Sequence, residues 1–328
     1  IQFSGEDFAG NVAINVSVEN ITFDTSPPVI VINEPTANGF YNQVMLGYEL
    51  NEILVSGKII LERRGGANDP MSPHEIALSN DQLLPGKKSD FLINTHANLI
   101  SNTTYNIRIE GQDMAGNMGK SLEIAGVTFD DIPPDISVTS PAPDSYINET
   151  ILGLRTNEVL SEAIIEWIWV DGNPDPAGAH ESKMIGDQLQ DGDYPEVKFD
   201  PPPSLISSAR YRVVYTGTDR AGNTSTYALG TLFYDNEPPE ISMLFPIENG
   251  FTNANEVSYE LNESLLMANL IWTSIDGAET ISIDLAGDEL KPGIFTQATL
   301  ANQSELSDGT VYNLSITAID RSGNEAEI

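Results

Sequence analysis

Acidic residues that can bind a cation recur along this chain at a fixed spacing. The phrase Asp-x-x-Gly-Asn occurs four times, and its aspartates lie 106, 106 and 101 residues apart, at Asp7, Asp113, Asp219 and Asp320. Another aspartate stands three residues before each Pro-Pro pair, at Asp24, Asp130 and Asp235. An Asn-Glu pair recurs in the same phase and contributes Glu52, Glu158 and Glu263. These in-phase markers indicate internal repeats of about 105 residues.

The donor atoms of these residues favour Ca²⁺ over other cations. Ca²⁺ takes six to eight oxygen ligands in an irregular arrangement, whereas Mg²⁺ requires a nearly octahedral set. Zinc sites use Cys or His, and the chain has no cysteine. We therefore predict Ca²⁺ as the cofactor of these residues.

The segments between the recurring acids have the pattern of β-strands. Apolar and polar residues alternate in them, as in half-buried strands, and Gly and Pro residues interrupt them. The clearest segments are Val44–Leu50, Lys58–Glu62, Tyr105–Glu110 and Val257–Leu261. A 3.6-residue period never extends beyond a turn or two. The sequence therefore predicts an all-β fold.

Three tyrosines relate these strands to an immunoglobulin-like (Ig-like) sandwich. Tyr105, Tyr211 and Tyr312 each stand eight residues before a phrase aspartate. They resemble the tyrosine corner at the start of strand F, whose phenol binds upstream backbone. Strand F then ends at the phrase, the phrase is the F–G turn, and strand B ends at the Asn-Glu pair. Strand A is predicted at Val29–Asn33, Ile136–Thr139 and Ile241–Phe245, and strand G at Leu122–Phe129 and Tyr227–Tyr234. Trp167 or Trp169 is expected in the core.

This strand assignment predicts where the recurring acids meet. In an Ig-type sandwich the B–C and F–G loops share one pole with the start of strand A, and the linker from the preceding repeat arrives there. The predicted ligand sets are Asp24, Glu52, Asp113 and Asn117 at the first junction, Asp130, Glu158, Asp219 and Asn223 at the second, and Asp235, Glu263, Asp320 and Asn324 at the third.

Two alternatives to calcium stay open. The phrase also makes a good turn without a metal, since Asp can cap local N–H groups while Gly and Asn accept a positive φ. In that case the linker aspartates and the Asn-Glu pairs are ordinary solvent-facing residues. The other alternative is a ligand different from Ca²⁺.

The composition narrows the class of partner. The chain has 49 Asp and Glu against 15 Lys and Arg, a net charge of −34. Such a polyanion repels nucleic acid and anionic membranes, and no apolar run is long enough to span a bilayer. A polyanionic surface also suits a saline habitat. The absence of cysteine excludes disulfides and thiol catalysis.

The repeat phase predicts the domain boundaries. Residues 1–24 correspond to strands F and G of a preceding repeat, and 25–130, 131–235 and 236–328 to three Ig-like repeats, the last without most of strand G. We expect a segment of a longer, elongated array. The alternative is strand exchange, in which residues 1–24 of one copy complete the last repeat of another copy.

The phrases Asp-x-Ala-Gly-Asn and Asp-x-x-Pro-Pro resemble those of bacterial Ig-like repeats in large surface and secreted proteins. The resemblance covers nearly the whole chain and implies tandem antiparallel β-sandwiches in an extracellular or cell-surface stalk. Such repeats occur in adhesins, filaments and surface layers and as spacers in secreted enzymes. The resemblance is therefore specific for fold and weak for function.

The sequence does not predict an enzyme. There is no Gly-x-Ser-x-Gly elbow, and His74, His96 and His180 are expected in variable loops that share no repeat phase. The function favoured is a non-catalytic structural or adhesive stalk or filament segment, stiffened by calcium at its junctions. Its partners would be neighbouring repeats, with self-assembly or a surface glycan or protein as further possibilities.

Two alternatives to this function stay open. In the first alternative, the loops Arg63–Leu84 and Asp171–Pro195 bind glycan or protein. In the second, the repeats are spacers of a larger secreted enzyme. Eight Asn-x-Ser/Thr sequons are glycosylation acceptors only in a host that modifies them.

Overall fold

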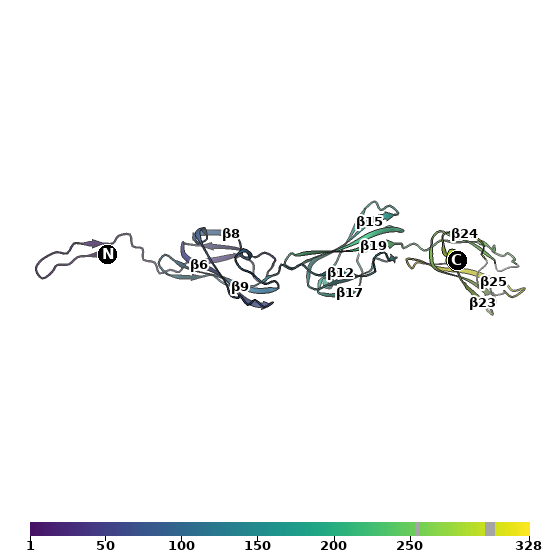
Figure 1. The fold of residues 1–328 in the computed structure, drawn as a ribbon, viewed down its shortest axis with the longest axis horizontal. Helices are drawn as coiled ribbons and strands as arrows, with labels where there is room; N and C mark the ends of the chain where they lie inside the picture. Colours follow the sequence, from purple (N-terminus) through teal and green to yellow (C-terminus); the bar gives the residue numbers. More distant parts are fainter. Residues whose placement is uncertain (253–255, 299–305) are drawn as a thin grey trace. The chain divides into compact units, whose positions relative to one another are not determined.

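The computed structural model describes residues 1–252, 256–298 and 306–328. Its regular structure is almost entirely β-strand (Figure 1), which confirms the all-β prediction. The helical segments of the described residues are short 3-10 turns, η1 (Asn80–Leu83), η2 (Ile93–Thr95), η3 (Gly186–Leu189) and η4 (Gly287–Leu290). No helix in this part of the chain is long and apolar enough to cross a membrane.

The chain divides into two compact units. The first comprises Ile1–Ile132 with Arg220–Asn223, and the second Pro133–Asp219 with Thr224–Ile328. We keep the names first, second and third repeat for residues 25–130, 131–235 and 236–328. The short turn 220–223 is therefore part of the second repeat in sequence and of the first unit in space.

The first repeat contains two sheets of mainly antiparallel strands. One has the order β3-β5-β8, and the other has the order β4-β11-β9-β6-β7, with β10 paired to β9. Only the short β4 pairs in parallel, with β11. The strands are β3 (Ile30–Glu34), β4 (Phe40–Tyr41), β5 (Met45–Leu50), β6 (Leu54–Gly66), β7 (His74–Ala77), β8 (Gly86–Leu92), β9 (Thr103–Asp113), β10 (Met118–Lys120) and β11 (Ile124–Phe129).

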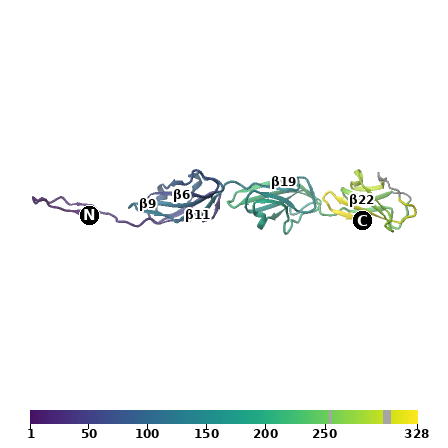
Figure 2. The same ribbon diagram turned by 90° about the horizontal axis from the view of Figure 1, so that it is seen from below.

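The second repeat has the same plan, with sheets ordered β12-β14-β17 and β13-β19-β18-β15-β16. Its strand β19 is labelled in Figure 2. Its strands are β12 (Ile136–Ser140), β13 (Tyr146–Ile147), β14 (Leu152–Thr156), β15 (Leu160–Gly172), β16 (Ala179–Lys183), β17 (Gly192–Val197), β18 (Ala209–Asp219) and β19 (Thr224–Tyr234).

The third repeat follows the plan in its described part, with sheets ordered β20-β21-β24 and β23-β22-β25-β26. Its strands are β20 (Ile241–Phe245), β21 (Val257–Leu261), β22 (Leu265–Ser274), β23 (Thr280–Asp284), β24 (Gly293–Ala298), β25 (Tyr312–Asp320) and β26 (Glu325–Glu327). At the other end, β1 (Gln2–Phe3) and β2 (Val16–Ser17) form an isolated hairpin whose apolar side chains are exposed.

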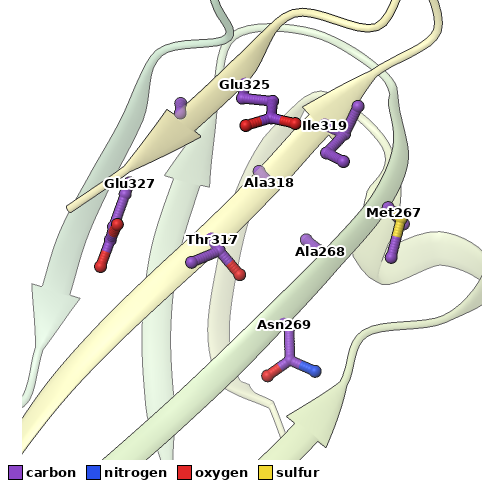
Figure 3. A pocket seen from close by; sticks show the side chains of 9 residues that line it. Met267, Ala268, Asn269, Thr317, Ala318, Ile319, Glu325 and Glu327 are labelled. Atoms are coloured by element: carbon purple, nitrogen blue, oxygen red, sulfur yellow. The ribbon is translucent and has the colours of Figure 1, made fainter.

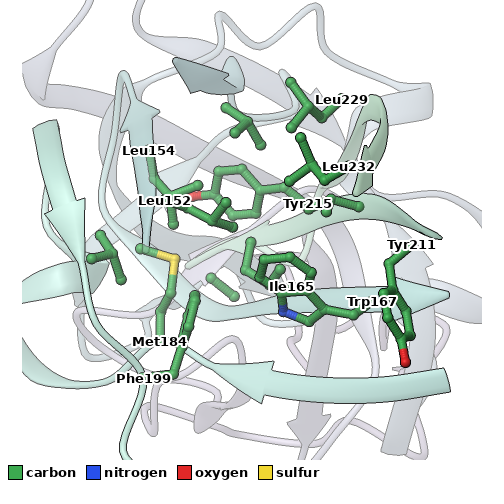
Figure 4. Packing of buried hydrophobic residues seen from close by; sticks show 14 of the residues in the cluster. Leu152, Leu154, Ile165, Trp167, Met184, Phe199, Tyr211, Tyr215, Leu229 and Leu232 are labelled. Carbon is green, nitrogen blue, oxygen red and sulfur yellow. The ribbon is translucent and has the colours of Figure 1, made fainter. Parts of the chain in front are cut away.

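Each repeat has its own hydrophobic core between its two sheets. In the second repeat Trp167 is fully buried against Ile165 and Met184 (Figure 4), as the sequence predicts. The strands alternate accordingly: along β9 and β18 every second residue is buried. Burial of alternate residues therefore fixes which side chains of strand F face the core.

The tyrosine corner is confirmed in all three repeats. The phenol oxygens of Tyr105, Tyr211 and Tyr312 each accept a hydrogen bond from a backbone N–H five residues upstream, at 3.2, 2.9 and 2.9 Å. Because these tyrosines lie within the first three residues of strands β9, β18 and β25, the corner fixes the start of each strand that ends at a phrase aspartate.

One prediction about local structure is confirmed with a small shift and another is wrong. Strand G of the first repeat, predicted at Leu122–Phe129, is present as β11 from Ile124 to Phe129. The short strand β10 precedes it, and between the two the Ser121 hydroxyl accepts the Ile109 N–H and donates to the Leu122 carbonyl. The expected loops Arg63–Leu84 and Asp171–Pro195 instead contain β7, η1, β16, η3 and part of β17. The same strand, 3-10 turn and strand succession occurs in all three repeats, so these segments are not divergent loops.

Candidate metal centre

The phrase forms a tight turn in which the aspartate accepts its hydrogen bonds locally. Asp113 Oδ1 accepts the backbone N–H groups of Ala115 and Asn117, both at 2.8 Å, and Asp113 Oδ2 accepts Asn117 Nδ2 at 2.8 Å. Gly116 has a φ of 93°, which a side chain would strain. Burial acts to raise the pKa of Asp113, but the hydrogen bonds from Asn117 and Ala115 outweigh it and hold the pKa below its ordinary value.

Asp320 forms the same turn in the third repeat. Its Oδ1 accepts the N–H groups of Ser322, Gly323 and Asn324 at 2.8, 2.7 and 2.9 Å. Asp113 and Asp320 are each only 1% exposed, although each lies at the end of a strand. Such burial leaves an ionised carboxylate dependent on these donors or on a cation.

The asparagine in each of the last three phrases binds the linker backbone to the turn. Asn117 Nδ2 donates to the Asp24 carbonyl at 3.3 Å, and Asn324 Nδ2 donates to the Asp235 carbonyl at 2.8 Å. Asn223 Nδ2 donates likewise to the Asp130 carbonyl, at 2.8 Å. These bonds bring a linker aspartate next to a phrase aspartate that is about 90 residues away in sequence.

The asparagine of each Asn-Glu pair holds the start of strand A. Asn51 Oδ1 accepts the Val29 N–H at 2.8 Å, and Asn157 and Asn262 accept the N–H groups of Asp135 and Glu240 at 2.8 and 2.9 Å. The neighbouring glutamate is thereby placed beside the linker. The Asn-Glu pair is recognisable in the sequence, but the bond from its asparagine to strand A was not predicted. The only signal for this bond is the constant spacing of 22 residues between donor and acceptor.

Two predicted carboxylate clusters assemble in the structure. Asp24, Glu52 and Asp113 form the first cluster, and Asp235, Glu263 and Asp320 form the third cluster. In each cluster one oxygen from every residue lies within 4.8 Å of the others. Among the described residues, no Lys or Arg forms a salt bridge with these six carboxylates. No ion pair among the described residues therefore offsets the charge of either cluster.

The pKa of Glu263 shows the cost of this arrangement. Burial, together with the charges of Asp235, Asp320 and Glu237, raises the pKa of Glu263 to about 7. Two carboxylates 4 Å apart repel by about 4 kcal/mol at the effective dielectric of a protein surface. A divalent cation at this position would remove the repulsion and return the glutamate to its ionised form.

The linker aspartates have partners of their own. Asp235 accepts the hydroxyls of Ser207 and Ser208 at 2.6 and 3.1 Å, and Asp130 accepts the Ser101 hydroxyl at 2.7 Å. For Asp24 the structure gives only the Ser26 N–H, at 2.9 Å. The hydroxyls orient a carboxylate and leave lone pairs for a further ligand.

The second predicted set is divided between the two compact units. Asp130 and Asn223 belong to the first unit, whereas Glu158 and Asp219 belong to the second. Asp219 is 1% exposed at the end of β18, as its counterparts are in the other repeats. Its assembly into a site with Asp130 and Glu158 therefore remains a prediction.

The donor chemistry of the first and third clusters fits Ca²⁺. Three carboxylates offer up to six oxygens, and water or backbone carbonyls complete a set of six to eight. The predicted role of the asparagines as ligands is less direct. Asn117 and Asn324 turn Nδ2 toward the aspartate, so each would coordinate only through Oδ1.

Two repeats contain a buried network of His, Asp and Tyr that was not predicted from the sequence. His74 and His180 are 106 residues apart, so the statement that the histidines share no repeat phase is wrong for this pair. His74 Nε2 and the Tyr105 hydroxyl both lie 2.6 Å from Asp69 Oδ2. His180 and Tyr211 contact Asp175 Oδ2 in the same way, at 2.6 and 2.7 Å.

This network extends the tyrosine corner. Burial acts to raise the pKa of Asp69, but hydrogen bonds from Tyr105 and His74 outweigh it and lower the pKa. In the third repeat Glu279 accepts the Tyr312 hydroxyl instead. The strand that contains a histidine in the other repeats begins here at Thr280. The spacing of the two histidines was the available signal, and it was hidden by the change in the third repeat.

A shallow pocket lies on the β22–β25–β26 sheet (Figure 3), with a volume of about 390 Å³. It is open and is lined by Met267, Ala268, Asn269, Thr317, Ala318, Ile319, Glu325, Ala326 and Glu327. None of the predicted ligand residues lines it, and it brings together no pair of acid and base suited to catalysis.

Comparisons with known proteins give low similarity. No family model and no curated protein matches the chain. A crystal structure of a tetra-tandem repeat in the extending region of a large adhesion protein has a TM-score of 0.30 and 18% identity over 99% of this chain and 79% of that one.

Two further solved structures are similar at the same level. A 1.5-MDa bacterial ice-binding adhesin, described in terms of host cell surface retention, has a TM-score of 0.31 and 15% identity over 93% of this chain and 96% of that one. The FN1–FN3 domains of chicken CNTN1 have a TM-score of 0.27 and 14% identity over 92% and 97%. At these TM-scores the likeness carries no inference about what this chain does.

Proposed function

We propose that this chain is a non-catalytic structural segment of an extracellular or cell-surface protein, in which Ca²⁺ bound at the junctions stiffens a stalk of Ig-like repeats. The observation that supports the proposal is the repeated convergence of three carboxylates. Two of them come from the beginning and the end of the sequence of one repeat, and the third comes from the linker. A single acidic cluster on so acidic a chain would mean little. Two equivalent clusters, built from the same three sequence positions, indicate a common purpose.

The position of the clusters determines the proposed mechanism. Each joins a linker aspartate, a B–C glutamate and an F–G aspartate, so a cation bound there would tie the linker to both loops of the following repeat. The Pro-Pro pair already restricts φ in the linker. Without the cation, repulsion among the carboxylates opposes closure of the junction, and the asparagine bonds act against this repulsion.

Calcium concentration supports an extracellular setting for this mechanism. Extracellular calcium modules bind with dissociation constants of about 0.1–1 mM, and a site of three carboxylates with partly engaged oxygens belongs in this range. Such a site would be filled outside a cell and empty in a calcium-poor cytosol. Stalk stiffness would then appear only after export.

Small-angle X-ray scattering tests the proposal. We expect the maximum dimension of the chain to be larger and better defined in Ca²⁺ than in excess EGTA. The Ca²⁺ concentration is about 5–10 mM, roughly ten times the expected dissociation constant. Ionic strength is held constant, and Mg²⁺ is the control cation. The melting temperature should rise by roughly 5–10 °C, since tenfold saturation of one site contributes about 1.4 kcal/mol.

A matched pair of variants separates calcium from general acidity. Asp7→Asn changes the same turn where no other carboxylates converge, and should leave both responses intact. Glu52→Gln with Glu263→Gln should abolish most of the response without touching any turn hydrogen bond. If Ca²⁺ changes neither the maximum dimension nor the melting temperature of the unmodified chain, the proposal is wrong.

A further inference from the structure

A second contact recurs at the junctions, beside the carboxylate clusters. The residue after the phrase aspartate is Arg220 in the second repeat and Arg321 in the third. The Arg220 guanidinium lies 3.8 Å from the ring centre of Phe40, within the first compact unit. The Arg321 guanidinium lies 5.6 Å from the ring centre of Tyr146, within the second, and donates to the Tyr146 hydroxyl at 3.3 Å.

The two rings occupy equivalent places. Phe40 begins β4 and Tyr146 begins β13, and each of these short strands pairs in parallel with the end of strand G, at Thr128 and Phe233. Two residues upstream, Asn38 and Asp144 have φ values of 59° and 61°, so the same tight turn presents each ring. That turn is followed by an aromatic residue at 106-residue spacing.

The Tyr146 ring in the second repeat is held by neighbouring side chains of the same repeat. Tyr146 stacks on Phe233 with ring centres 4.6 Å apart and an angle of 13°. The Arg210 guanidinium lies 4.6 Å from the centre of the Phe233 ring and forms two 2.9 Å hydrogen bonds with Asp171. Arg321 therefore contacts a ring whose orientation three other side chains fix.

Cations are scarce on this chain, with 15 Lys and Arg against 49 Asp and Glu. Two of the 15 occupy the same phrase position and contact an aromatic ring of the preceding repeat. Earlier copies of the phrase carry Phe8 and Met114 there, both exposed. The position therefore varies in sequence, whereas the Asp, Gly and Asn of the phrase do not.

We propose that Arg321 is a locking residue of the junction between the second and third repeats: its guanidinium binds the ring of Tyr146 in the preceding repeat and holds the junction closed without a metal. Arg220 makes the equivalent contact with Phe40. The contact of Arg321 with Tyr146, here called the clasp, deepens the proposed stalk function, on which its biological purpose rests, but its geometry does not depend on calcium. The aromatic ring of one repeat and the phrase arginine of the next determine which repeats fit together.

Distance measurement between two spin labels in the full chain tests the clasp. The chain has no cysteine, so Glu196→Cys on β17 and Thr280→Cys on β23 give two unique attachment sites on exposed residues of the second and third repeats. The measurement is made in excess EGTA. A cation–π contact of ordinary strength changes the population of an open junction by roughly 2- to 30-fold.

We expect a narrow distance distribution for the labelled parent and a broad one for Arg321→Ala and for Tyr146→Ala. The double variant should be no broader than either single variant, because both remove the same contact. Tyr146→Phe retains the ring and should stay close to the parent. Arg155→Ala makes the same charge change at an exposed arginine that pairs only with Asp193, and should have no effect.

Equal distributions for Arg321→Ala and Arg155→Ala would overturn the clasp. A repeat of the series in Ca²⁺ separates it from the calcium proposal. If calcium is not bound, adding it leaves every distribution unchanged while Arg321→Ala still differs from the parent. If the clasp is absent, calcium narrows parent and Arg321→Ala alike.

Discussion

Two copies of the same turn, at Asp7 and at Asp320, differ in what surrounds them. Asp7 accepts the N–H groups of Ala9 and Asn11 at 2.9 and 3.0 Å and Asn11 Nδ2 at 2.8 Å, much as Asp320 does with its own turn. Yet Asp7 lies in an exposed hairpin, and no metal cluster among the described residues includes it. Asp320 is 1% exposed and lies in a cluster with Asp235 and Glu263.

This comparison shows that the turn forms from local sequence alone. The side-chain bond from Asn11 is the largest of the effects that lower the pKa of Asp7, and no sandwich is needed for it. The turn by itself therefore does not indicate a metal. This agrees with the alternative, left open by the sequence, that the phrase forms a turn without a metal. The convergence of a glutamate and a linker aspartate on the turn is the feature that requires another explanation.

The largest expected effect comes from removing the aspartate of each turn. Asp320→Ala should destabilise the third repeat by about 3 kcal/mol in EGTA, because it leaves several partly buried N–H groups without an acceptor. Asp7→Ala should leave the stability of all three repeats unchanged. Urea unfolding, followed by hydrogen–deuterium exchange in β25, measures the difference; equal effects would mean that burial does not distinguish the two turns.

A pH titration sharpens the comparison at the cluster itself. The pKa of Glu263 is raised from 4.5 to about 7 in the folded chain, so the stability linked to this group is present below pH 4.5 and is lost as the pH rises through about 7. In EGTA the third repeat should therefore become less stable between about pH 5 and about pH 8, while added Ca²⁺ should offset the loss.

Glu263→Gln should flatten this pH dependence and remove the calcium response with it. The control is Glu260→Gln on the exposed side of β21. Melting curves at several pH values provide the measurement. A parent chain whose third repeat grows steadily more stable over this pH range would contradict the assignment.

The smallest expected effect concerns the asparagines. Asn324→Ala removes the bond to the Asp235 carbonyl as well as the bond within the turn, and should destabilise the third repeat by about 1 kcal/mol. Asn11→Ala removes only a bond within an exposed turn, and we expect no change in the three repeats. Amide exchange at Asn236 and Glu237 should rise in Asn324→Ala alone; a rise in neither variant would show that the asparagine does not hold the linker.

The sequence predicted which carboxylates meet, but it did not predict all of the hydrogen bonds that position them. The common spacing of Asp24, Glu52 and Asp113, placed on an Ig-like strand order by Tyr105, was enough to predict that they meet. The role of Asn51 was not predictable in this way, because a side-chain acceptor for a backbone N–H leaves no pattern beyond its spacing. His74 and His180 did leave a pattern, but it is absent from the third repeat.

The short strand β10 was missed for a different reason. The Ser121 hydroxyl bonds that separate β10 from β11 leave no pattern in the sequence. The aromatic partners of Arg220 and Arg321 were also missed, since Phe40 and Tyr146 look like ordinary strand residues. Contacts between separate repeats depend on their packing, which a pattern within one repeat does not specify.

Calorimetric titration with Ca²⁺ tests most directly the claim that converging carboxylates, rather than the turn, form the metal site. The unmodified chain, Asp7→Asn and the double variant Glu52→Gln with Glu263→Gln are compared at one pH and ionic strength. We predict binding with a dissociation constant of about 1 mM or below for the first two proteins, and the loss of two sites in the third. Absence of binding in the unmodified chain, or unchanged binding in the double variant, would contradict the account.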